Sequence, residues 1–155
     1  MPDQRRRQIR LPAETYAESG RVFSVTVGTA PKAPIFDDLA FGKECVQLLH
    51  GLRASLGNPV YAFCLMPDHV HLLLGVGRGS PLGEIVGAWK SRCYLLRRRR
   101  GHDERFWQRG YYDHGLRTTG DLKAAALYIL HNPVRAGLVQ DFHHYPLCGS
   151  LEFEM

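Results

Sequence analysis

The chain has 155 residues, of which 45% are hydrophobic and 23% are charged, and its formal net charge is +5. This length and composition suit one globular domain and exclude a disordered or membrane-spanning chain, because no apolar run approaches the roughly 20 residues that a membrane helix needs. The positive charge comes largely from arginines at positions 5–10 and 97–100, which fits a nucleic-acid partner and fits an ordinary solvated surface equally well.

The N-terminal segment and the cysteines bear on location. The opening MPDQRRRQIRLPAE holds arginines with no apolar segment behind them, so we expect no secretory signal. The four cysteines are far apart and form no Cys-x-x-Cys pair, which predicts reduced thiols in a cytoplasmic protein. We expect a single domain over residues 1–155 that begins with a short basic arm.

In chain order, the first predicted element is a strand over residues 21–29, RVFSVTVGT, in which polar and apolar side chains alternate. Residues 39–56 place apolar side chains at helical spacing, which predicts a helix that the following Gly-Asn-Pro sequence ends. The apolar runs 60–65 and 70–76 come next. The turn-forming pair Pro67-Asp68 between them predicts a β-hairpin.

A second helix is predicted to start with Ser80 as its N-cap and Pro81 as its first helical residue. Apolar residues then recur at helical spacing as far as the arginines at 97–100, which suit the C-terminal end of a helix. Residues 104–117, ERFWQRGYYDHGLR, hold four aromatics among charged residues and glycines. We expect a further strand within this segment.

The third predicted helix buries positions 122, 125, 126 and 129, and Asn132-Pro133 ends it. The tail to residue 155 shows no clear periodicity. The order strand, helix, strand, strand, helix, strand is that of a ferredoxin-like (RRM-like) α+β sandwich, in which an antiparallel sheet carries its helices on one face.

Two histidines follow the predicted hairpin turn in the sequence CLMPDHVHLLL. Side chains two residues apart on a strand point the same way, so His69 and His71 share one face and could converge on a divalent cation. On spacing alone, a pair of ordinary half-exposed histidines is the simpler interpretation.

The third helix adds a phenol and an amide. If positions 122, 125, 126 and 129 are buried, Tyr128 lies on the flank of the helix, and Asn132 lies one turn later on the same side. A metal site and a tyrosine hydroxyl together suit phosphodiester chemistry, in which the hydroxyl attacks phosphorus and forms a phosphotyrosine. The alternative is that Tyr128 buries its ring and exposes its hydroxyl, as tyrosines often do.

The segments CLMPDHVHLLL, WQRGYYDHGLR and LYILHNPVRAGLV, in this order and spacing, resemble the REP-associated tyrosine transposases, a branch of the single-tyrosine HUH transposases. The resemblance covers about residues 16–147. It implies that His69 and His71 hold Mg²⁺ or Mn²⁺ with Asn132 as the third ligand, and that Tyr128 is the nucleophile. The turn reads Pro-Asp where many relatives have Pro-Asn.

The resemblance also implies the reaction. Relatives cleave single-stranded DNA beside a folded hairpin, leaving a 5′-phosphotyrosine and a free 3′-hydroxyl, and reversal with another strand gives strand transfer. The expected partner is therefore single-stranded DNA that forms hairpin repeats. His114 and His131 are alternative metal ligands, and the resemblance is compatible with a monomer or a homodimer.

The residues expected to contact DNA come from the second helix and from the aromatic segment. They are Lys90, Arg92, Arg97, Arg98, Trp107, Arg109 and Arg117. Either Trp107 or Tyr111 could stack on unpaired bases. The alternative is a solvated basic rim around core aromatics.

Two other function classes compete with the transposase. The same sandwich supports modules that bind hairpins without cutting them. A phosphodiesterase could instead use a metal-activated water, with Tyr128 only orienting the substrate.

Overall fold

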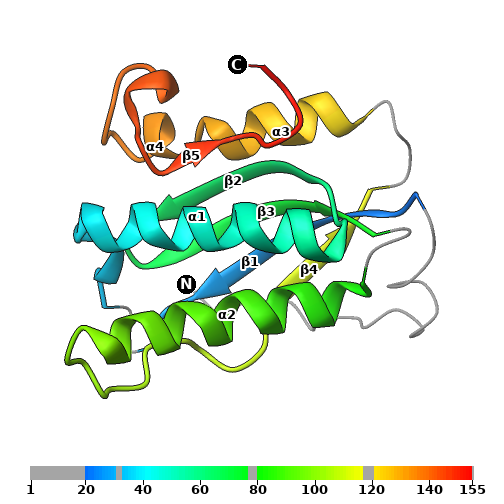
Figure 1. Ribbon diagram of the computed structural model, residues 1–155. Helices are drawn as coiled ribbons and strands as arrows, with labels where there is room; N and C mark the ends of the chain where they lie inside the picture. The colour runs from blue at the N-terminus through cyan, green and yellow to red at the C-terminus, as the bar shows by residue number, and fades with distance from the viewer. Residues whose placement is uncertain (1–19, 31–32, 77–79, 117–120, 155) are drawn as a thin grey trace, which may run out of the picture.

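The computed structural model describes residues 20–30, 33–76, 80–116 and 121–154. Five strands form one sheet in the order β4-β1-β3-β2-β5, and every pair of neighbouring strands is antiparallel. The strands are β1 (Val22–Gly28), β2 (Val60–Met66), β3 (His69–Gly75), β4 (Tyr112–Gly115) and β5 (Cys148–Gly149). The helices are α1 (Leu39–Leu56), α2 (Leu82–Arg99), α3 (Leu122–Leu130) and α4 (Asn132–Arg135) (Figure 1).

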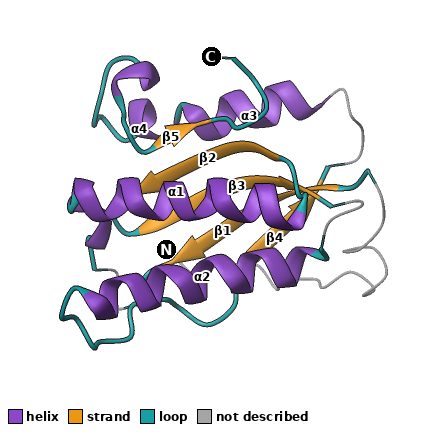
Figure 2. Ribbon diagram, viewed as in Figure 1, coloured by secondary structure: helices purple, strands orange, loops and turns teal. Residues whose placement is uncertain are grey.

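The predicted ferredoxin-like α+β architecture is confirmed for the first four strands and for α1 and α2. Figure 2 shows these two helices side by side across the same face of the sheet. The alternating residues Phe23, Val25 and Val27 of β1 pack beneath them, together with Trp89, which is completely buried. The period-two pattern of β1 thus directs every second side chain into this core.

The third helix lies on the opposite face of the sheet, which corrects the expectation that all helices cover one face. Ala126 and Ile129 of α3 pack against Ala62 and Cys64 of β2 and against Leu73 of β3. The central strands β2 and β3 are apolar on both sides, so both of their faces need a cover. One helix layer could not bury them both.

The predicted bounds of α1 are confirmed, and the side chain of Asp38 caps its first turn by accepting from the Phe41 amide at 3.1 Å. The predicted start of α2 is wrong by one residue. Helix α2 begins at Leu82, and Ser80 does not cap it. The side chain of the buried Asn58 instead holds the backbone of Ser80: its Nδ2 donates to the Ser80 carbonyl at 2.8 Å, and its Oδ1 accepts from the Ser80 amide at 3.0 Å.

The sequence suggested that Asn132-Pro133 ends the helical segment, but a second short helix begins there. Helix α3 ends at Leu130, and Asn132 opens the short helix α4, in which Pro133 occupies the first turn. Proline is tolerated there because the first amides of a helix have no intrahelical acceptor. The Asn-Pro pair therefore marks a break between two helices.

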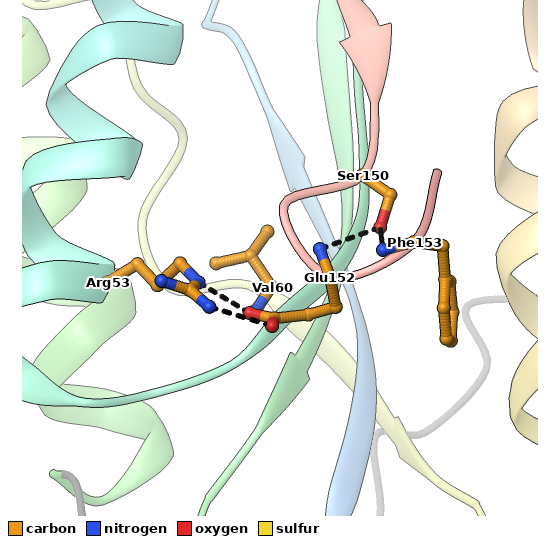
Figure 3. Close-up of polar contacts among 5 residues, drawn as sticks. All are labelled: Arg53, Val60, Ser150, Glu152 and Phe153. Carbon is orange, nitrogen blue, oxygen red and sulfur yellow. Dashed lines mark hydrogen bonds and ion pairs between the residues drawn. The ribbon is translucent and has the colours of Figure 1, made fainter. Parts of the chain in front are cut away.

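The C-terminal tail adds a fifth strand that the sequence did not reveal. Strand β5 pairs with Phe63 and Cys64 at the edge of β2. Beyond it, the carboxylate of Glu152 accepts from the guanidinium of Arg53 at 2.6 and 2.8 Å and from the Val60 amide at 3.1 Å (Figure 3). These contacts fasten the tail to the end of α1 and the start of β2.

The described part of the chain contains no helix that combines the length and the apolar character needed to cross a bilayer.

Candidate active site

The tight β2–β3 turn places the histidine pair at one end of the sheet. Pro67 and Asp68 form the turn, and Met66 pairs with His69 at its base. His69 and His71 lie on the same face of β3, with ring centroids 4.9 Å apart and planes at 89°. The prediction that the two imidazoles share one face is confirmed.

Each imidazole has a polar neighbour that orients it. His69 Nδ1 lies 2.7 Å from Asp68 Oδ1, and His71 Nδ1 lies 3.3 Å from Thr26 Oγ1. A carboxylate on Nδ1 favours a proton at that nitrogen and leaves Nε2 as the electron-pair donor. The Pro-Asp turn thus supplies His69 with a partner of the kind that orients metal-binding histidines.

The electrostatic setting keeps His71 neutral. Its pKa is lowered from 6.5 to about 4, chiefly by burial, then by the neighbouring His69 and by the positive charge of Arg135. A neutral imidazole at physiological pH retains a lone pair for a ligand. His71 is therefore available to a cation at physiological pH without competition from a proton.

The second half of the site comes from α3 and α4. Tyr128 is 66% exposed, and the guanidinium of Arg135 stacks over its ring at 3.9 Å. The same guanidinium donates to the Tyr128 carbonyl at 2.6 Å and to Asn132 Oδ1 at 3.0 Å. Arg135 thus holds the tyrosine and the asparagine together.

Arg135 also connects this helical half to the histidines. Its charge contributes to the lowered pKa of His71 and opposes the rise in the pKa of Cys64 that the Cys148 hydrogen bond and burial cause, so the guanidinium lies within electrostatic range of β2 and β3. Sequence reasoning missed Arg135. The available signal was its position in the motif, three residues after Asn132 and seven after Tyr128, which is the spacing of one helix face.

The donor set fits a divalent cation that keeps open coordination positions. No group of three or more His, Cys, Asp or Glu side chains gathers anywhere in the described ranges, so two imidazoles would need an amide oxygen to complete a protein ligand set. Asn132 Oδ1 accepts from Arg135 and has a second acceptor position left. Its Nδ2 donates to the Ile129 carbonyl at 3.0 Å, which fixes the orientation of the amide.

The two alternative histidines have different surroundings. His131 Nδ1 contacts the Leu127 carbonyl at 2.7 Å, and its ring packs on Phe142. His114 is an exposed residue of β4 paired with Ser24 of β1. Neither gathers with the His69 and His71 pair into a metal-binding cluster of the described residues.

The proposed DNA-contact residues on α2 lie across the sheet from the histidines. Lys90 and Arg97 belong to the helix layer that covers the Phe23 face, whereas His69 and His71 point to the α3 face. Arg97 stacks over Phe106 at 5.7 Å, and Arg98 forms an ion pair with Asp103 at 3.7 Å.

The remaining predicted contacts differ in exposure. Arg92 and Arg109 are exposed, and Arg117 lies outside the described residues. Trp107, which was expected to stack on bases, lies mostly in the core: its ring is 8% exposed, packs on Phe106, and its indole N–H donates to the Lys90 carbonyl at 2.9 Å. Packing in the aromatic core leaves little of this ring open to a base.

Comparisons with known proteins agree with this geometry. The sequence model of the family described as "Transposase IS200 like" matches residues 23–132. A Haemophilus influenzae protein classed as a REP-associated tyrosine transposase is 28% identical over 96 residues, which cover 55% of this chain and 54% of that protein. The chain therefore spans about half the length of this curated relative.

A solved structure, that of a REP-associated tyrosine transposase bound to a REP hairpin, shares the fold. It superposes with a TM-score of 0.71 at 17% sequence identity and covers 90% of this chain and 80% of that one.

Proposed function

The chain belongs to the IS200-like transposase family, and from this membership we propose that it cleaves and rejoins single-stranded DNA beside hairpins through a covalent bond to Tyr128. The observation that carries the proposal is the cluster around Arg135. This side chain touches Tyr128 and Asn132 and acts electrostatically on His71, which supports a shared site for residues of two motifs that are far apart in the sequence.

Tyr128 would act as the nucleophile. Its exposed hydroxyl would attack phosphorus, form the Tyr128 O–P bond and displace the 3′ oxygen, which leaves as a free hydroxyl after taking up a proton. The phenolic proton passes to solvent. The reverse attack by a 3′-hydroxyl of another strand would release Tyr128 and join the two strands, so no external energy source is needed.

The histidines and the asparagine would hold the cation. His69, His71 and Asn132 would bind Mg²⁺ or Mn²⁺, which would neutralise charge on a non-bridging phosphate oxygen when bound. Asp68 would keep the His69 ring oriented, and the low pKa of His71 would keep its ring neutral. Arg135 would add a fixed positive charge beside the ring of Tyr128, whose hydroxyl attacks the phosphate.

The test uses a panel of 3′-end-labelled hairpin oligonucleotides with single-stranded flanks, incubated with Mn²⁺, Mg²⁺ or EDTA and resolved on denaturing gels. The 3′ label stays on the fragment that the tyrosine would capture, so the wild type should give a protein-linked band that EDTA abolishes. Tyr128→Phe should give none. Tyr112→Phe is the matched control, because Tyr112 is 59% exposed on β4.

The competing classes give different results in the same assay. Cleavage that survives in Tyr128→Phe without a protein-linked band would mean hydrolysis by water and would contradict the proposal. Hairpin binding with no cleavage by the wild type across the panel would contradict it in favour of a binding module.

A further inference from the structure

A cavity of about 640 Å³ opens between α2 and the segment that precedes β4. Its lining residues are Lys90, Ser91, Tyr94, Arg105, Trp107, Gln108, Arg109 and Gly110. This volume lies within the range of small-molecule sites and accommodates one nucleotide.

The cavity is cationic. Lys90, Arg105 and Arg109 line it, and none of its described lining residues is acidic. Other arginines of the same region have carboxylate partners: Arg98 pairs with Asp103, and Arg100 pairs with Glu44 at 2.7 Å. The charge of the cavity is therefore not neutralised by its own walls, and an anion would be stabilised there.

Lys90 is held in place to act on such an anion. Its Nζ donates to the carbonyls of Gln108 and Gly110 at 2.9 and 2.8 Å, which leaves one of its three N–H donors for a ligand. Burial lowers the pKa of Lys90, and the nearby charge of Arg105 lowers it further. A phosphate bound between Lys90 and Arg105 would offset the repulsion between their charges.

Gln108 links the cavity to the histidine side of the sheet. The backbone N–H of Gln108 donates to the Gly28 carbonyl at 2.9 Å. The side-chain carboxamide of Gln108 fills the space that a side chain at residue 28 would occupy, with Oε1 only 2.6 Å from an ideal Cβ on Gly28. Gly28 pairs directly with His69. Paired residues project to the same face, so the carboxamide lies beside His69.

We propose that this cavity binds one unpaired nucleotide of the DNA strand that is cleaved, with its phosphate at Arg105, Arg109 and Lys90 and its base against Tyr94. The proposal rests on the proposed function, which supplies DNA as the ligand. It adds a subsite at the β4 edge of the sheet, near the end of β1, from which Gln108 leads to the histidines. The strand would pass around this edge from the α2 side to the catalytic side.

The test measures fluorescence anisotropy of 5′-fluorescein dT12 over a range of NaCl concentrations. Arg105→Gln with Arg109→Gln removes two exposed side chains that make no ion pair among the described residues, so the fold should persist. Each lost phosphate contact lowers the magnitude of the log–log salt slope by about 0.7, so the double variant, which disrupts the contact to one phosphate, should lose about 0.7. Its affinity at low salt should fall by at least about tenfold.

Lys43→Gln is the matched control, since it removes one exposed charge from α1 outside the cavity. It should leave the affinity and the slope unchanged. A 12-residue abasic strand tests the base contact: the wild type should bind dT12 at least about fivefold more tightly, as expected for stacking of one base. Equal affinity for the two strands would overturn the nucleotide assignment.

Unchanged affinity and slope in the double variant, or no binding of dT12 by the wild type, would overturn the cavity as a DNA subsite. The gel assay for the protein-linked band separates this failure from failure of the proposed function. If the wild type gives the protein-linked band but the double variant binds dT12 unchanged, only the cavity proposal is contradicted. If the wild type gives no band but its dT12 binding depends on the cavity, only the proposed cleavage chemistry is contradicted.

Discussion

Arg135 sets the electrostatics of the candidate site at the scale of single residues. Its guanidinium stacks on Tyr128, binds Asn132 and opposes protonation of His71. Sequence patterns show which face of a helix a residue occupies, but the reach of an arginine across to a neighbouring sheet depends on tertiary packing. The spacing could place Arg135 on the face of Tyr128 and Asn132, but its influence on His71 could be recognised only from the structure.

Removing this charge should raise the pKa of His71. In metal-free protein, His71 should titrate near pH 4, and in Arg135→Gln its pKa should rise toward 6.5 without reaching it, because burial is the larger cause. Histidine side-chain NMR across a pH series measures this directly. Arg99→Gln, on the exposed side of α2, controls for a general loss of charge.

An unchanged His71 pKa in Arg135→Gln would contradict the electrostatic link between α4 and β3. The sign for stability follows from the same shift. A folded-state pKa below the ordinary 6.5 means that the unfolded chain binds the proton more readily. The stabilising contribution is present above pH 6.5 and is lost as the pH falls toward 4.

At the scale of elements, α1 is packed against the C-terminal segment through a glycine. An ideal Cβ on Gly42 would lie 2.5 Å from a methyl group of Leu147, which is itself buried. The carbonyl of Leu147 accepts from the Leu65 amide at 2.8 Å, which ties its backbone to β2 and leaves only the buried side chain free to adjust.

Gly42→Ala should therefore lower the free energy of unfolding by about 1–3 kcal/mol, as overpacking of a core does. Gly51→Ala is the matched control in the same helix, because an ideal Cβ on Gly51 meets nothing within 4 Å. It should raise stability by about 0.5–1 kcal/mol. Urea denaturation of both variants measures the difference, and equal stability of the two would rule out the tight contact.

The tail beyond β5 should depend on the Glu152 carboxylate. Glu152→Gln loses the ionic contact to Arg53 but keeps an acceptor for the Val60 amide, so the Tm at pH 7 should drop by a few degrees. The pKa of Glu152 is lowered from 4.5, mainly by the hydrogen bond from Arg53. Its contribution is present above pH 4.5 and is lost as the pH falls through the lower folded-state pKa.

Thermal melts at neutral pH and at about pH 3 check this behaviour. The Tm difference between the wild type and Glu152→Gln should shrink at the acid end. A difference that stayed constant with pH would show that the charge of Glu152 does not hold the tail.

At the scale of the whole molecule, the positive charge and the candidate chemistry lie on different sides of one sheet. The cations of α2 belong to the layer over one face, and the histidines, α3 and α4 occupy the other. A DNA strand that used both would have to pass an edge of the sheet. The cavity beside Gln108 lies on the β4 side of the sheet, near the end of β1.

Single-strand binding by the wild type should weaken steeply with salt. The net charge of +5 and the cationic cavity predict counterion release, with a log–log slope of about −0.7 for each neutralised phosphate. Anisotropy titrations of dT12 in NaCl would measure the slope. A flat response would contradict phosphate contact by this surface.

Much of this molecule follows from local sequence patterns. The strand at β1, the bounds of α1, the β2–β3 hairpin and the shared face of His69 and His71 follow from periodicity and turn chemistry, because each depends on neighbours in sequence. The apolar side chains on both faces of β2 and β3 already indicated that both faces of the sheet are covered. The expectation of helices on one face overlooked that signal.

The remaining differences depend on contacts between distant segments. Ser80 does not cap α2 because Asn58, 22 residues earlier, holds its backbone. Trp107 is a core residue because α2 and the neighbouring aromatics close over it. Strand β5 has only two residues, which is too short for a detectable alternation. Nothing in the local sequence determines these arrangements.

The most direct measurement is to locate the covalent nucleotide. Wild-type protein would be incubated with a cleavable hairpin oligonucleotide and Mn²⁺, treated with nuclease and digested with trypsin, and its peptides identified by mass spectrometry. The tryptic peptide of residues 124–135, AAALYILHNPVR, contains Tyr128 as its only tyrosine. The predicted result is a nucleotide attached to this peptide through its 5′-phosphate. Strand cleavage with no modified peptide, or modification of the peptide of residues 110–117 that carries Tyr112, would contradict Tyr128 as the nucleophile.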